Sequence, residues 1–410
     1  MRRHTLLTIT LMFVLTGVWG QPWVKHVDDI EKKGDPVTFF ELQEAFEEYW
    51  SGKGVERGTY LKNGVRRKAP GWKQFKRWAH YWQYRIDPAT GKFPNTTPYR
   101  ELKAYKREHS QAMASDPSSW RNLGIASSEG GYAGIGRLNA IAFHPDDDQV
   151  MWVGAPSGGL WKSEDGGSSW RIQNEGTAVL GVSDIVVPDD YSSSQTLFIA
   201  TGDRDGGSLW TLGGGQSNDN NSMGVLKSSD GGETWQTSLS FDVSQKKLVT
   251  RILMHPGDDR VLYAATSDGV YRTQDEGANW EYLSSASFID MEFKPGDPTI
   301  MYGSTQSYSQ TRIYRSTDGG KSWEMVQEVS GIRTELSVTP DAPARVYAIA
   351  ANNQGGLKGI YRSTDSAKSF ELVHSGQNLL GYYSDGSETG GQGSYDLTIQ
   401  ADPNHGDTLF

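Results

Sequence analysis

The sequence predicts an all-β fold, a β-propeller of four-stranded blades preceded by a small helical N-terminal region. Two observations predict the propeller. A short motif recurs five times, every 40 to 65 residues, and strand-like segments with turns rich in Asp and Gly surround each copy. Glycine (48 of 410 residues) and tryptophan (14) are also frequent, which suits a β-rich protein with many turns.

The motif has the composition of a hairpin turn. Its copies read SEDGGSSW, SSDGGETW, TQDEGANW, STDGGKSW and STDSAKSF, beginning at Ser163, Ser228, Thr273, Ser316 and Ser363. Glycine adopts backbone angles that other residues resist, and an Asp side chain can accept hydrogen bonds from N–H groups of its own turn. We therefore expect structural roles for the Asp and the aromatic residue of each copy: Asp165, Trp170, Asp230, Trp235, Asp275, Trp280, Asp318, Trp323, Asp365 and Phe370.

Each repeat also predicts four strands. The first alternates polar and apolar residues and ends at a proline, over 138–145, 182–188, 250–256, 289–295 and 334–340. A second strand follows, a third enters the motif, and a fourth leaves from its aromatic residue. This pattern predicts five blades, and residues 395–403 open a sixth.

The propeller segment is expected to be truncated at its C-terminal end. Residues 117–121 repeat the start of a fourth strand, as in 167–171, and an unpaired fourth strand at the front of a propeller normally completes the last blade. The sequence therefore predicts the N-terminal part of a longer protein.

The first 20 residues have the pattern of a signal peptide. Arg2 and Arg3 precede a mostly apolar run over 6–18, and the small residue Gly20 ends the segment. A membrane anchor is the alternative, but the run is short for a span. There is no cysteine, which excludes disulfides and thiolate metal sites. We expect an exported protein, secreted or at the cell surface of a bacterium, with no transmembrane segment after signal removal.

Residues 21–116 are expected to form a helical region. Thr38 and Glu41 have capping-box spacing, and helical stripes of apolar residues follow over 39–50 and 72–82, with a third helix over 99–113. Residues 21–115 carry 18 Lys and Arg against 12 Asp and Glu, a net charge of +6, whereas residues 116–410 carry 20 against 38, a net charge of −18. This asymmetry favours two domains, with the propeller over 117–410, and argues against nucleic-acid binding.

The motif copies resemble the Asp-box, or BNR, repeats of the sialidase-like superfamily, which includes xyloglucanase-type glycosidases and sortilin-type receptor propellers. The similarity covers about residues 120–410. It implies that the first strand of each blade lines the central channel and that the Asp-box turns lie away from any active site. The N-terminal GWKQFKRW and the late GGQGSYDL segments are similar to large secreted surface proteins of the Bacteroidota.

Candidate binding residues lie where the first strands start. Counting five residues back from the terminal proline leads to Arg251, Asp290 and Glu335, and Asp184 and Asp396 fall near the same place in two other blades. These charges could form a binding site at the channel mouth. The alternative is a set of mutually paired, solvated channel charges.

Two of these residues are also candidate catalytic groups. Glycosidases need two carboxyl groups that flank the scissile bond, and Asp290 and Glu335 come from successive blades. The resemblance, however, implies a catalytic Asp before a Gly pair after the second strand of the first blade. Here Pro156 stands in that place.

Two Gly-rich loops carry further candidates. The loop over 202–224 offers Asp203, Asp205 and Asp219 as oxygen ligands for Ca²⁺, although no cofactor is required and a solvated loop is the alternative. Tyr382 and Tyr383, in the second loop, could stack against a sugar or a peptide.

The favoured interpretation is a sortilin-like binding or interaction module for a protein, peptide or glycan rather than an enzyme. The alternative is a glycoside hydrolase, sialidase- or xyloglucanase-like, that uses channel carboxylates. A purely structural module is the third interpretation.

Overall fold

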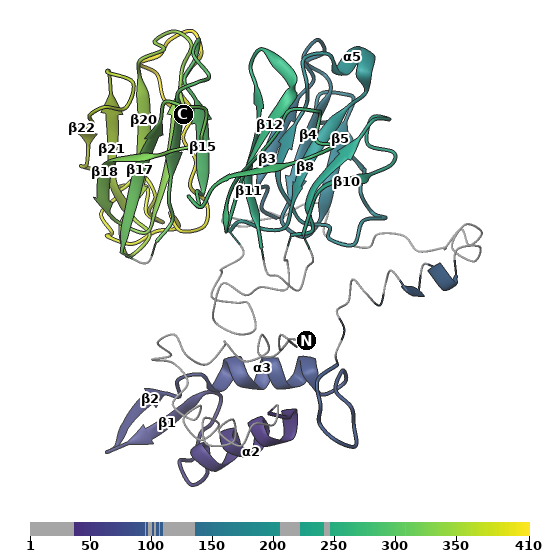
Figure 1. Cartoon of the computed structure of the whole chain (residues 1–410). Helices are drawn as coiled ribbons and strands as arrows, with labels where there is room; N and C mark the ends of the chain where they lie inside the picture. The colour runs from purple at the N-terminus through teal and green to yellow at the C-terminus, as the bar shows by residue number, and fades with distance from the viewer. Residues whose placement is uncertain are drawn as a thin grey trace, which may run out of the picture. The chain divides into compact units, whose positions relative to one another are not determined.

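The computed structural model describes residues 37–94, 96, 101, 104–105, 107–109, 136–205, 222–241, 247–307 and 309–410. The chain divides near residue 101 into two compact units (Figure 1). The expected signal peptide over 1–20 lies outside the described residues.

The N-terminal unit contains two amphipathic helices, α2 (Phe39–Trp50) and α3 (Trp72–Trp82). Helix α2 begins as the sequence predicts, because the Thr38 and Glu41 side chains each bond the other residue's backbone N–H. Phe46 stacks on Phe75 of α3 with ring centroids 4.0 Å apart, and both side chains are buried. The two helices are therefore joined by an aromatic core.

A β-hairpin corrects the expectation that this region is wholly helical. Strands β1 (Thr59–Lys62) and β2 (Val65–Lys68) pair antiparallel across a two-residue turn. Asn63 and Gly64 form that turn, and both have positive φ, at 53° and 76°. An Asn-Gly pair of this kind is a strong hairpin signal that the helical interpretation overlooked.

The third expected helix, over 99–113, lies mostly outside the described residues. Glu101, Ala104, Tyr105, Arg107 and Glu108 are helical.

The second unit confirms the predicted all-β propeller of four-stranded blades. It contains five antiparallel four-stranded sheets, each made of consecutive strands. Their strands are β3 (Ala140–Phe143), β4 (Met151–Ala155), β5 (Gly159–Ser163) and β6 (Arg171–Ile172); β7 (Val182–Val186), β8 (Leu197–Thr201), β9 (Gly224–Ser228) and β10 (Gln236–Ser240); β11 (Val249–His255), β12 (Asp258–Thr266), β13 (Gly269–Thr273) and β14 (Glu281–Ser284); β15 (Asp290–Phe293), β16 (Met301–Ser304), β17 (Gln310–Ser316) and β18 (Glu324–Ser330); β19 (Arg333–Val338), β20 (Val346–Ala351), β21 (Leu357–Ser363) and β22 (Glu371–His374). A short helix, α5 (Tyr191–Ser194), precedes β8.

A sixth blade begins after β22. Leu397, Ile399 and Ala401 alternate as buried residues, and the Gln400 and Phe410 backbones exchange hydrogen bonds of 2.8 and 2.9 Å. The chain thus contains five blades and the first hairpin of another.

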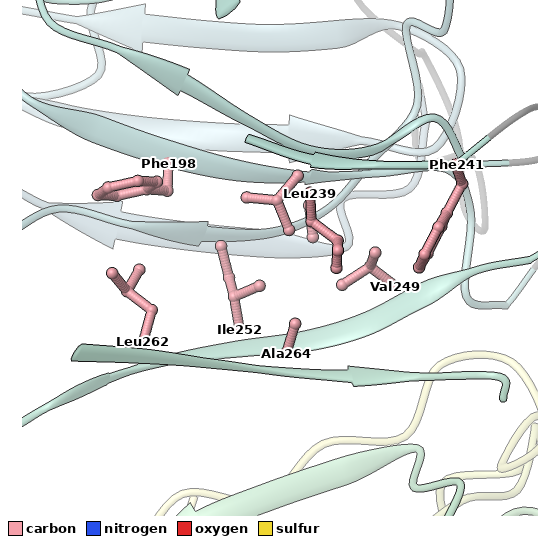
Figure 2. Packing of buried hydrophobic residues seen from close by; sticks show 9 residues of the cluster. Phe198, Leu239, Phe241, Val249, Ile252, Leu262 and Ala264 are labelled. Carbon is pink, nitrogen blue, oxygen red and sulfur yellow. The ribbon is translucent and has the colours of Figure 1, made fainter. Parts of the chain in front are cut away.

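The first strands of successive blades are neighbours: β3 contacts β7, β7 contacts β11, β11 contacts β15, and β15 contacts β19. Apolar side chains fill the space between blades. Between the second and third blades, Phe198 and Leu239 pack with Val249, Ile252 and Leu262 (Figure 2). Since each sheet covers its neighbour, the first strands converge on a common centre.

Each copy of the repeated motif forms the same turn. In the first copy, Asp165 accepts hydrogen bonds from the Ser163 hydroxyl (2.9 Å) and from the backbone and hydroxyl of Ser169 (2.8 and 2.6 Å). The same bonds recur at Asp230, Asp318 and Asp365, and at Asp275 the side-chain amide of Asn279 replaces the second hydroxyl. These bonds stabilise the ionised carboxylates and lower the pKa of Asp275 to about 2.

One face of the first blade's first strand is exposed, whereas the same face is buried in the third, fourth and fifth blades. Ile141 of β3 and its counterpart Ile252 of β11 pair with the second strand in the same register. Ile252 is 2% exposed against the preceding blade, whereas Ile141 is 57% exposed. The same position is buried in the fourth and fifth blades, at Met291 and Leu336.

This contrast predicts unequal effects of one substitution. Ile252→Ala should lower the free energy of unfolding by about 2–5 kcal/mol, because it opens a cavity between blades. Ile141→Ala should change it by no more than about 0.5 kcal/mol, because that side chain is largely in water. Urea unfolding of the two variants beside wild type measures both values, and equal losses would contradict the assignment of the two faces.

The motif turns predict a dependence of stability on acid. The folded-state pKa of Asp275 lies below its unfolded value of 3.8, so its contribution is complete above about pH 4 and is lost as the pH falls through about 2. Asp275→Asn should flatten the pH dependence of the unfolding midpoint in this range. An unchanged slope would show that the turn contributes no such linkage.

Candidate functional site

The starts of the first strands bring together a buried network of arginines and carboxylates. Because the strands of a blade are antiparallel, this end of the propeller also carries the loops that follow each second and fourth strand. Four of the five predicted binding residues, Asp184, Arg251, Asp290 and Glu335, belong to the network.

Arg251 of β11 is the centre of the first part of the network. Its guanidinium lies 3.6 Å from Asp184, 3.3 Å from Asp290 and 2.9 Å from Glu292, measured between the nearest nitrogen and oxygen atoms. These carboxylates come from β7 and β15, on either side of β11. One arginine therefore links three neighbouring blades.

Two of these carboxylates also fasten one blade to another. Asp184 accepts a hydrogen bond of 2.8 Å from the backbone N–H of Ile252, and Asp290 accepts one of 2.9 Å from that of Leu336. Each Asp thus binds the first strand of the following blade. Asp290 and Glu335 are each only 4% exposed.

Arg333 is the centre of the second part. It is the first residue of β19, its side chain is fully buried, and it bonds Glu335 at 2.6 Å and also Asp205. Its Nη1 lies 3.5 Å from the carbonyl oxygen of Ser394. Its Nη2 is buried without a hydrogen-bond partner among the described residues.

Arg137 joins the first and second blades to the start of the sixth. It donates two hydrogen bonds of 2.7 Å to Asp203, lies 3.0 Å from Asp205, and covers the ring of Tyr395 at 4.2 Å. The predicted calcium ligands Asp203 and Asp205 therefore face arginines. Asp219 lies outside the described residues, and calcium binding stays a prediction.

Burial shifts the protonation of several carboxyl groups in the network. Burial raises the pKa of Asp184 and of Glu335, although Arg251 and Arg333, respectively, oppose the shift. Burial also raises the pKa of Glu292 to about 7, against the effect of Arg251. Asp396 is exposed, and partial burial raises its pKa while Arg137 opposes the shift.

Asp184, Asp290 and Glu335 are therefore paired, as one interpretation of the sequence expected, but they are buried rather than solvated. Sequence reasoning missed Glu292, Arg333, Arg137 and also Arg204, whose guanidinium lies 3.6 Å from Asp205. Strand alternation could have found the first two, because Glu292 shares a face with Asp290, and Arg333 shares one with Glu335. Arg137 and Arg204 lie outside the strands, where no periodicity marks them.

None of the helices in the described part of the chain is long and apolar enough to span a bilayer. Within the same residues, no group of three or more His, Cys, Asp or Glu side chains is arranged to hold a metal ion.

The chain is similar in sequence to xyloglucanases. A xyloglucanase from Paenibacillus sp is 28% identical over 206 residues, which cover 48% of this chain and 18% of that protein. A xyloglucanase from Acetivibrio thermocellus is 28% identical over 185 residues, which cover 43% of this chain and 20% of that protein. The chain thus spans about a fifth of the length of these relatives. No family model matches it.

Solved structures of GH74 enzymes align with about two thirds of this chain. The GH74 xyloglucanase from Xanthomonas campestris aligns with a TM-score of 0.47 at 17% identity, covering 67% of this chain and 41% of that one. The GH74 enzyme of Niastella koreensis aligns with a TM-score of 0.49 at 15% identity, covering 66% and 43%. The sequence relatives favour the glycoside hydrolase alternative over the interaction module, and they do not single out a sortilin-type propeller.

The network predicts a large difference between two arginine substitutions. Arg333→Ala should lower the free energy of unfolding by about 3–5 kcal/mol, because it leaves Glu335 and Asp205 buried without their counter-charge. Arg312→Ala, which removes an exposed pair with Glu328, should cost about 0–1 kcal/mol. Chemical denaturation of both variants tests this, and similar losses would contradict the structural role of Arg333.

Proposed function

We propose that the propeller unit is a polysaccharide-acting module of the glycoside hydrolase type, with a neutral β-glucan such as xyloglucan as its substrate. The observation that carries this proposal is the 28% identity to a xyloglucanase over nearly half of the chain. The N-terminal segment with signal-peptide pattern supports a substrate outside the cell. The net negative charge of residues 116–410 favours an uncharged polysaccharide over an acidic one.

Glu292 is the best-suited proton donor of the network. Glycoside hydrolysis needs one carboxyl group that is protonated at the working pH, so that it can donate to the leaving oxygen. Pro156 stands where the resemblance implies a catalytic Asp, so a catalytic carboxyl group must come from elsewhere. Burial raises the pKa of Glu292 to about 7, and its side chain is 20% exposed, which leaves it within reach of a ligand.

Asp290 is the best-suited second carboxylate. It lies two residues before Glu292, on the same face of β15, and both side chains bind the guanidinium of Arg251. Sharing one planar group keeps the two carboxyl groups close, as a pair that acts on one glycosidic bond must be. Glu335, the other carboxylate expected from the sequence, is assigned a positioning role beside Arg333.

The proposal predicts the effect of one conservative substitution. Glu292→Gln should lower kcat on xyloglucan by about 10²–10⁴-fold, because the amide cannot donate the proton. Wild-type activity should also fall as the pH rises above about 7, where Glu292 loses its proton. Release of reducing sugar across pH 5 to 9 measures both effects.

Glu328→Gln is the matched control. Glu328 is an exposed carboxylate on β18 whose partner is Arg312, outside the channel network. This variant should keep wild-type turnover. Loss of activity in both variants, or full activity in Glu292→Gln, would contradict the assigned donor. A broad glycan panel with binding but no turnover would instead support a glycan-binding module.

A further inference from the structure

The long loop after the fifth blade carries three large side chains that are exposed. It covers residues 375–394, between β22 and the first strand segment of the sixth blade. Leu379, Tyr382 and Tyr383 are 56%, 60% and 65% exposed, and together they are called the tyrosine platform. The loop contains two acidic residues, Asp385 and Glu388, and no Lys or Arg.

One half-buried amide organises this loop. The Asn378 side chain accepts hydrogen bonds from the backbone of Leu357 (2.7 Å) and Leu380 (3.2 Å) and donates to the carbonyls of Glu388 (2.9 Å) and Gly390 (2.8 Å). Asn378 therefore joins strand β21 to both halves of the loop.

The loop between β20 and β21 of the same blade supports the loop over 375–394. Gly393 donates to the carbonyl of Gly355 at 2.7 Å, and the Asn352 side chain donates to that of Thr389 at 3.0 Å. A Cβ on Gly391 would lie 2.1 Å from the carbonyl oxygen of Leu380, so only glycine permits this approach. The platform thus rests on a loop that is already fixed, and binding to it would cost little ordering entropy.

The loop also reaches the channel network. Its last residue, Ser394, approaches Arg333 through its carbonyl, and the next residue, Tyr395, lies beneath Arg137. The connection after a fourth strand lies at the end of the propeller where the first strands start. The platform is therefore on the same end as Glu292 and Arg251.

We propose that the tyrosine platform is a docking site for a neutral β-glucan chain, an inference that rests on the proposed function and extends it. Flat aromatic side chains present an apolar face that matches the C–H face of a pyranose ring, while the phenol can hydrogen bond to sugar hydroxyls. Ser384 and Ser387 are exposed in the same loop and offer further hydroxyl partners. The absence of cations from the loop, together with its two carboxylates, selects against acidic polysaccharides.

The experiment is calorimetric titration of the full chain with a xyloglucan oligosaccharide and with cello-oligosaccharide. Tyr382→Ala/Tyr383→Ala should raise Kd about tenfold or more, while the thermal unfolding midpoint stays unchanged, because both side chains lie in water. Tyr84→Ala, which removes a 75% exposed tyrosine in the N-terminal unit, should leave Kd within about twofold. Polygalacturonate should not bind.

Several outcomes would overturn the platform. Wild type could fail to bind either neutral glucan, or the double variant could keep the wild-type Kd. Tyr84→Ala could lose as much affinity as the double variant, or polygalacturonate could bind as well as the neutral glucans. Different outcomes overturn the tyrosine platform and the proposed hydrolysis. Tyrosine-dependent binding without sugar release supports the platform and overturns hydrolysis, whereas sugar release with an unchanged Kd in the double variant overturns the platform alone.

Discussion

The architecture depends on the burial of apolar sheet faces between neighbouring blades. A sheet of this size has two faces rich in apolar side chains, and neither is stable in water. Between the second and third blades, for example, Phe198 and Ile252 are removed from solvent by contact with the adjacent sheet. Repetition of this contact brings the first strands together at the centre, and the site follows from that convergence.

The central network has a double role because of this convergence. Charges at strand starts would be expensive to bury singly, and the structure pairs them across blades around Arg251 and Arg333. Burial raises the pKa of Glu292 to about 7 against the effect of Arg251, and its side chain is still 20% exposed. Glu292 thus links neighbouring blades through Arg251, and in the proposed function it is also the proton donor.

The two ends of the propeller are built from different chemistry. The motif turns use short polar side chains, such as Asp165 with Ser163 and Ser169, and satisfy their own backbone locally. The opposite end is made of long connections such as residues 375–394, whose backbone is satisfied by Asn378 and by a neighbouring loop. The motif turns are short and bond within themselves, whereas the longer loop exposes the Tyr382 and Tyr383 side chains.

The sequence by itself determined the features that depend on short-range order. The motif turns, the alternating strands and the Thr38 capping box are each set by residues a few positions apart, so periodicity and turn chemistry predicted them. It also located Arg251, Asp290 and Glu335, since strand starts repeat. Only the tertiary structure decided which charges meet. Arg137 and Arg333 both contact Asp205 across a large separation in the chain, because blade packing sets those contacts and no local pattern encodes them.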